Sequence, residues 1–91
     1  MEITTEMIKK LLDGLVLPMF DGIEEIEVED VYLFDDSDIV YPTINIIFNK
    51  DKFLEFENVD LFESEISRAV KSTLKYLNIT ESIVDFYIPS E

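Results

Sequence analysis

Three glutamates at alternate positions, Glu25, Glu27 and Glu29, are the first side chains in this sequence that could do chemistry. In an extended strand, residues two apart point to the same face at about 7 Å from each other. Two carboxylates at such a spacing can divide the roles of general acid and general base. The neighbouring sequence supplies no apolar pocket or basic side chain that would make them unequal. We therefore interpret the three as a solvated sheet face, with acid–base chemistry as the alternative.

A second acidic group consists of Asp35, Asp36 and Asp38. Clustered carboxylates are ligands that Mg²⁺ and Ca²⁺ prefer, but the glycine and the final glutamate of a calcium-binding EF-hand loop are missing here. An aspartate-rich stretch between two apolar runs is also typical of a hairpin turn. The sequence therefore predicts a solvated turn, with no bound metal and no cofactor.

The sequence contains no histidine and no cysteine. Imidazole catalysis, thiol nucleophiles, zinc–thiolate sites and disulfides are thereby excluded. Its two glycines, Gly14 and Gly22, form neither a phosphate-binding loop nor a dinucleotide-binding fingerprint. These absences favour a protein that is not an enzyme.

One basic stripe is present, made of Arg68, Lys71 and Lys75. A spacing of three and four residues places the three on one side of a helix. The stripe could contact phosphate, but no aromatic residues alternate with it as they do in surfaces that bind nucleic acids. We expect these bases to neutralise neighbouring acids and to stabilise the C-terminal end of the helix.

Acidic side chains dominate the sequence, with 21 acids against 7 bases and a net charge of −14. The interval 11–49 holds ten acids and no base, so it carries −10 of this charge and the rest carries −4. Such a surface repels DNA, RNA and anionic lipid, so direct binding to nucleic acids or membranes is not expected. Two interpretations stay open: the charge keeps the domain soluble, or it recognises a basic partner.

Apolar side chains at helical spacing predict a helix over 5–17 and another over 58–77. Thr4 or Thr5 is suited to begin the first helix, and Asn58 or Asp60 the second. The apolar arc of the first helix covers about half of its circumference, which is wider than one core contact requires. Part of this arc is therefore expected to contact a second element or a second subunit.

Alternating apolar residues predict strands over 24–34, 39–48 and 82–88. In the first of them, Val31 and Leu33 fall on the face that also carries the three glutamates. Either a bulge near 29–30 shifts the register, or another element covers the far end of this face.

The segment 49–57 fits either a loop or a short extra strand over 53–57. Its Phe53, Leu54 and Phe56, together with Leu61 of the following helix, form a candidate apolar patch for docking a partner. The alternative is that these side chains belong to the edge of the core beneath a connecting segment.

The expected fold is one α+β domain over 1–91, a small two-layer sandwich with the order α-β-β-(β)-α-β. Its mainly antiparallel sheet of three to four strands would carry two helices on one face. The N-terminal residues lack the basic and apolar regions of a signal peptide. We therefore expect a cytoplasmic protein, or a virion protein if the chain is encoded by a phage.

The order helix–strand–strand–helix–strand resembles the reduced KH-like domain of bacterial ribosome-binding factor A. It also resembles small tail-completion and connector subunits of phages, which carry two helices on an antiparallel sheet. The first resemblance implies a degenerate KH-like factor associated with the ribosome. The second implies a structural subunit of a phage particle.

The leading functional hypothesis is a non-enzymatic module for protein–protein interaction or assembly, such as a small acidic adaptor or a structural subunit of a symmetric complex. It would bind a protein partner or a second copy through the apolar patch or the first helix, while the acidic hairpin steers the encounter. The alternative is an inhibitor that mimics nucleic acid, in which the carboxylates of 25–38 replace phosphates on a basic nucleic-acid enzyme.

Overall fold

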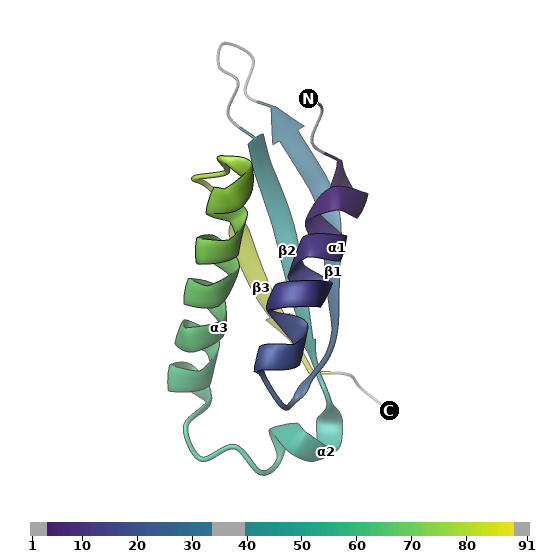
Figure 1. Cartoon of the computed structure of the whole chain (residues 1–91). Helices are drawn as coiled ribbons and strands as arrows, with labels where there is room; N and C mark the ends of the chain where they lie inside the picture. The colour runs from purple at the N-terminus through teal and green to yellow at the C-terminus, as the bar shows by residue number, and fades with distance from the viewer. Residues whose placement is uncertain (1–3, 34–39, 89–91) are drawn as a thin grey trace.

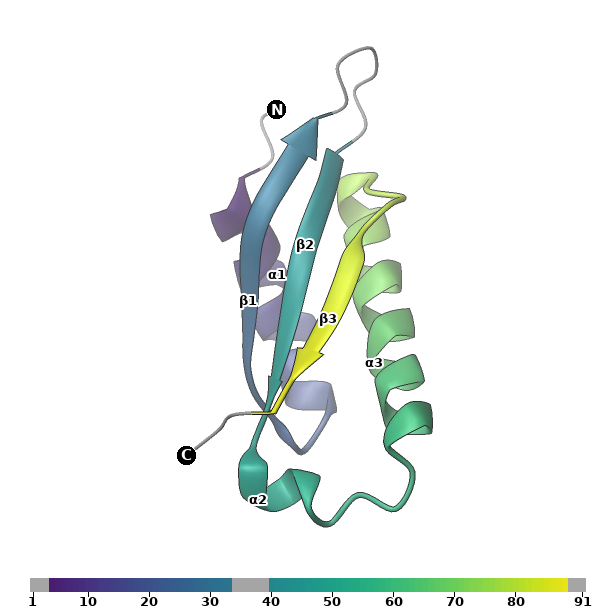
Figure 2. The same ribbon diagram turned by 180° about the vertical axis from the view of Figure 1, so that it is seen from behind.

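The computed structural model of the chain describes residues 4–33 and 40–88, and within them the side chains of 30–33, 40 and 41 are not described. The predictions for Phe34, Asp35, Asp36 and Asp38 therefore lie outside the described residues. The described part is a small α+β fold, in which helices cover one face of a three-stranded mixed sheet (Figures 1 and 2). In chain order its elements are α1 (Thr5–Leu15), η1 (Leu17–Met19), β1 (Ile23–Leu33), β2 (Val40–Phe48), α2 (Lys50–Phe53), α3 (Val59–Leu74), η2 (Lys75–Leu77) and β3 (Ile83–Tyr87).

Both long helices begin at the side chains that the sequence predicts. The Thr4 hydroxyl accepts a hydrogen bond from the Met7 backbone N–H, and the Asn58 side chain accepts one from Leu61 N–H. Each bond satisfies a donor that has no partner inside its helix. At the other end of the second helical segment, Asn78 adopts a left-handed conformation with φ 60° and ends η2. The predicted range 58–77 divides into α3 and the 3₁₀ turn η2, whereas in the predicted range 5–17 the α-helix ends at Leu15 and η1 begins only at Leu17.

The hairpin of β1 and β2 is antiparallel, as predicted, and it contains the bulge, which was one of the two alternatives for this strand. Val28 pairs with Ile44 but Val31 pairs with Pro42, so Glu29 and Asp30 add one residue to β1. This extra residue shifts the in-and-out alternation of β1 by one position. The shift explains why the sequence pattern assigns the glutamates and the apolar residues that follow them to the same face.

The expected sheet is mainly antiparallel, but the third strand, β3, runs parallel to the central strand β2. The chain leaves β2 at one end of the sheet, returns along α3 and enters β3 in the same direction as β2 (Figure 2). A helical crossover of this kind joins parallel neighbours. The sheet is consequently mixed, with one antiparallel and one parallel pair.

The suggested extra strand over 53–57 is wrong. Residues 50–53 form the short helix α2, which begins where the Asn49 side chain accepts a hydrogen bond from Lys52 N–H. Phe53 and Phe56 are three residues apart, so a helical turn brings both rings toward the core on the same side. Both rings pack against Phe48, the last residue of β2.

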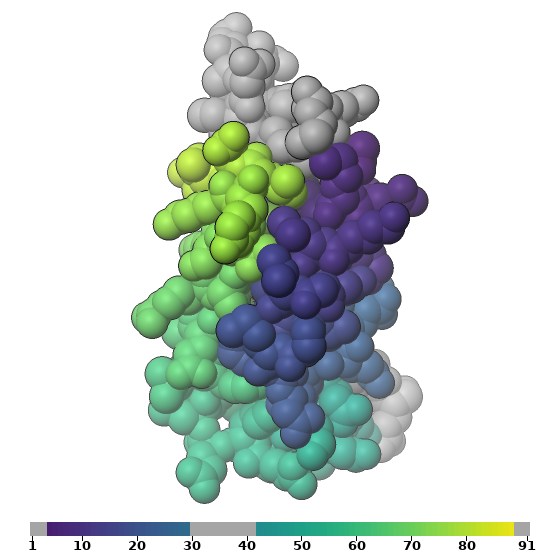
Figure 3. All heavy atoms as spheres, viewed as in Figure 1, coloured from purple at the N-terminus to yellow at the C-terminus, as the bar shows by residue number. Residues whose placement is uncertain are grey.

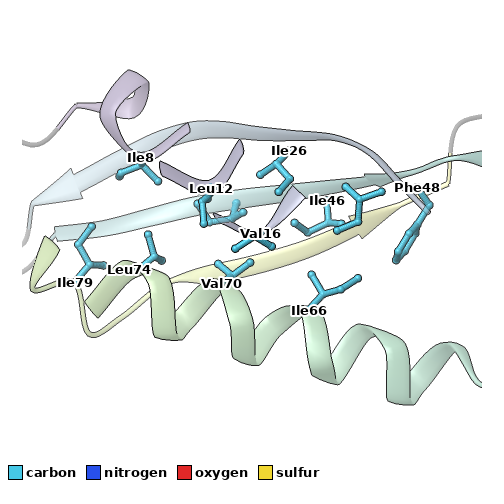
Figure 4. Packing of buried hydrophobic residues seen from close by; sticks show 12 residues of the cluster. Ile8, Leu12, Val16, Ile26, Ile46, Phe48, Ile66, Val70, Leu74 and Ile79 are labelled. Atoms are coloured by element: carbon cyan, nitrogen blue, oxygen red, sulfur yellow. The ribbon is translucent and has the colours of Figure 1, made fainter. Parts of the chain in front are cut away.

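The core lies between the sheet and the two long helices (Figure 4). α1 contributes Ile8 and Leu12, which are fully buried, and α3 contributes Ile66 and Val70. The remaining fully or almost fully buried apolar residues are Val16, Ile23, Ile26, Ile44, Ile46, Phe48, Leu74 and Ile79. Within residues 4–33 and 40–88, no helix is long and apolar enough to cross a bilayer.

Candidate protein-interaction surfaces

The sheet face opposite the helices, here called the outer face, carries part of the predicted acidic ladder. Glu25 pairs with Ile47 and Glu27 pairs with Asn45, while Glu29 lies in the bulge; all three glutamates are exposed. Asp85 of β3 lies on the other side of Asn45 and is also exposed. The structure therefore places these glutamates in solvent.

Asn45 is the exception on this face, because only 3% of its surface is exposed and its Oδ1 atom has no hydrogen-bond partner among the described residues. An unpaired buried polar atom lowers stability by about 1–3 kcal/mol. We expect Asn45→Val to raise the free energy of unfolding by about 1 kcal/mol and the Tm by about 4–8 °C, measured by thermal denaturation. The matched variant Asn45→Asp should be destabilising, since it adds a carboxylate between Glu27 and Asp85. A lower Tm for Asn45→Val would contradict this account.

The acidic side chains of the described residues do not gather in groups of three around a possible metal position. The predicted aspartate turn, Asp35, Asp36 and Asp38, is outside the described residues, so the expectation of a solvated turn stays a prediction.

The predicted apolar patch divides into two parts. Phe53 and Phe56 are half-buried in a cluster of aromatic rings around Phe48, whose ring stacks on Phe86 with centroids 5.8 Å apart. Leu54 and Leu61 are exposed, and 76% of the Leu54 surface meets solvent. The two phenylalanines thus serve packing, while the two leucines are available for contacts with another molecule.

The charge is distributed unevenly between the two layers of the fold. Residues 5–15 of α1 contain two acids and two bases, and residues 59–77 of α3 and η2 contain three of each, so both long helical segments are neutral. In contrast, β1 carries five acids and no base over 23–33. The helix layer is therefore the side on which another acidic molecule meets the least repulsion.

A groove of about 570 Å³ runs between the end of α1 and the middle of α3 on this neutral side. Figure 3 shows the same face, where the side chains of the two helices meet. Two large apolar side chains at the groove, Met19 and Tyr76, are 66% and 79% exposed. The lining residues are Leu15, Met19, Phe20, Glu65, Arg68, Ala69, Ser72, Thr73 and Tyr76. Exposed apolar side chains gathered in one groove are typical of surfaces that bind proteins.

The basic stripe lies along the exposed side of α3. Arg68, Lys71 and Lys75 are exposed and form no ion pair within the described part of the chain. Among residues 4–33 and 40–88 they therefore do not neutralise neighbouring acids through ion pairs, although they balance the three acids of 59–77 in net charge. They line a second, shallow groove of about 630 Å³, together with three serines and two acids of α3 and with Phe86 of β3.

Only some residues of the groove between α1 and α3 could be predicted from the sequence. The wide apolar arc of the first helix includes Leu15, which the structure places at the groove with 45% of its surface exposed. Met19 follows Pro18 and lies outside the helical period, and Tyr76 lies in the final 3₁₀ turn next to the predicted stripe. Their common surface exists only because α1 and α3 pack side by side.

Comparisons of this chain with models of protein families, with curated proteins and with solved structures found no match.

Proposed function

We propose that this protein is a non-enzymatic assembly module whose helix layer packs against a second copy of the chain. The observation that carries this proposal is the groove between α1 and α3, which presents exposed apolar side chains on the neutral layer of a protein with a net charge of −14. Two copies repel each other wherever their sheets approach, and they approach through the helices without that repulsion.

The polar residues of the groove also suit a symmetric contact. Glu65 and Arg68 are both exposed, lie one helical turn apart, and form no ion pair with each other or with other described residues. A two-fold axis through this surface brings the same patch of each copy together, so Glu65 of one copy can face Arg68 of the other. The apolar side chains supply the buried area, and the charged pair supplies orientation.

Sedimentation velocity between about 10 and 200 µM tests the proposal, because a micromolar association becomes visible in this range. We expect a dimer that persists or strengthens when salt is raised, since salt screens the remaining repulsion between acidic chains. Met19→Asp should give a monomer, because it places a charge in the middle of the apolar contact.

Leu54→Asp is the matched control, since it adds the same charge at a similarly exposed apolar position, directly after α2. The dimer should survive this change. A wild-type chain that stays monomeric would contradict the proposal. If Leu54→Asp alone abolished the dimer, the interface would lie at Leu54 and Leu61 instead of at the groove.

The exposed glutamates of β1 also support the mimicry of nucleic acid as a second candidate function. In that case the chain would bind a basic nucleic-acid enzyme, the affinity would fall steeply with salt, and DNA or RNA would compete. The opposite responses to salt separate this function from assembly through the helix layer.

A further inference from the structure

The two layers of this fold differ in width. Two packed helices lie about 8–10 Å apart and each is about 10 Å across, so together they cover about 20 Å. Three strands spaced about 4.8 Å apart span only about 14 Å. One more strand would complete the sheet beneath the helices.

The sheet is narrower than the helix layer at its β3 edge. Seen from both sides, α3 lies beyond β3 and overhangs that edge of the sheet (Figures 1 and 2). No described strand pairs with the other side of β3. The inward-facing side chains of this strand, Val84 and Phe86, are only half-buried, although the same face of the central strand is fully buried at Ile44 and Ile46.

The opposite edge of the sheet, β1, is protected against pairing. Its two register shifts, at 24 and at 29–30, interrupt the ladder, and four glutamates lie along it. Lys9 Nζ on α1 donates a 2.7 Å hydrogen bond to the Ile26 carbonyl of this strand. Charges, bulges and a capped backbone group are the usual protections of a sheet edge. Within the described residues, β3 has Asp85 as its single charged side chain and no register shift.

We propose that the β3 edge binds an extended acidic peptide segment, which adds a fourth strand to the sheet beneath α3. The backbone of the segment pairs with residues 83–87, in the manner of β-strand addition. Its inward side chains enter the groove between α3 and β3, where Phe86 provides an apolar contact.

The charge of the segment follows from the unpaired bases of this groove. Arg68 and Lys71 of α3 and Lys75 of η2 lie near the start of β3, whereas Asp60 and Glu63 lie at the other end of α3. Carboxylates therefore fit beside the start of β3, at Ile83 and Val84. The remainder of this acidic protein repels the same segment, which restricts it to this edge.

A second copy of the chain does not fit this edge. Pairing β3 with β3 across a two-fold axis would place the overhanging α3 of each copy above the strand of the other, so the helices would occupy the same space. Pairing β3 with β1 of another copy would bring α1 of that copy against the overhanging α3. A segment without its own helix layer avoids both overlaps.

Backbone amide NMR tests this site with a short blocked peptide in which glutamate alternates with valine. We expect saturable shift changes at residues 83–87 and at Ser67 and Lys71 of α3. A peptide with lysine in place of glutamate should not bind, nor should the glutamate peptide with methylated backbone nitrogens. Lys71→Glu should weaken binding about tenfold, while Lys10→Glu, the same charge change on α1, should alter it less than about twofold.

Equal binding of the lysine or methylated peptide would overturn the proposal, as would shifts confined to other surfaces or no saturable shift up to about 1 mM peptide. Evidence that β3 pairs with another copy in the free protein would also overturn it. The peptide site shares Arg68 and Ser72 with the groove between α1 and α3, but Met19 lines only the latter. Met19→Asp should therefore leave peptide binding unchanged, so failure of the dimer and failure of this site are distinguishable.

Discussion

Phe48→Ala is expected to lower the free energy of unfolding by about 3–5 kcal/mol, the range for removing a buried aromatic ring. Phe48 is 1% exposed and stands at the end of the central strand. Four rings surround it with centroid distances of 5.5 to 5.9 Å, namely those of Phe53, Phe56, Phe62 and Phe86. Alanine would leave a cavity between these rings, which come from α2, the segment after it, α3 and β3.

Urea denaturation followed by circular dichroism measures this loss. Phe48→Leu is the matched variant, since it keeps an apolar side chain at the site but removes the ring contacts, and it should lower stability by about 1–1.5 kcal/mol. A loss below about 1 kcal/mol for Phe48→Ala would contradict the packing described for this end of the sheet.

Gly22→Ala is expected to lower the free energy of unfolding by about 2–3 kcal/mol, from backbone strain and steric overlap together. Gly22 has φ 129°, which side-chain-bearing residues rarely adopt, and a Cβ there would lie 2.5 Å from Cζ of Phe56. The position is held in place, because Asn49 N–H donates a 2.7 Å hydrogen bond to the Gly22 carbonyl. The turn before β1 and the start of α2 thus meet at a residue that leaves no room for a methyl group.

The same substitution at the other glycine is the control for this effect. Gly14 lies within α1, and apart from its chain neighbours and the backbone of its own helix nothing lies within 4 Å of a Cβ built there. Gly14→Ala should therefore stabilise the protein by about 0.5–1 kcal/mol. The double variant Gly22→Ala/Phe56→Leu should recover part of the loss, and the part that remains measures the backbone strain. Equal effects at the two glycines would contradict the close contact with Phe56.

Local patterns in the sequence were sufficient for most elements of the fold. The caps Thr4 and Asn58, the stop at Asn78 and the bulge at Glu29 each depend on a few neighbouring residues, so they could be predicted without knowledge of the tertiary structure. The direction of β3 was also implied by the sequence, because the long helix between β2 and β3 forms a crossover. The expectation of a mainly antiparallel sheet omits this crossover.

The candidate surfaces were harder to predict, because they form between elements that are distant in the sequence. Periodicity identifies the basic stripe of α3 but not the overhang that places it beside the β3 edge. Phe53 and Phe56 were identified as apolar, but the choice between a docking patch and core packing depended on Phe48 and Phe62, which lie on other elements. Likewise, Met19 and Tyr76 line the same groove only because α1 packs against α3.

The neutral helix layer and the acidic sheet give this molecule a permanent electric dipole moment directed across its two layers. In the field of a positively charged body, the molecule experiences a torque that turns the outer face of the sheet toward that body. In the field of a negatively charged body, the torque reverses and presents the helices with their unpaired bases. The orientation on approach is therefore selected before any side chain makes contact.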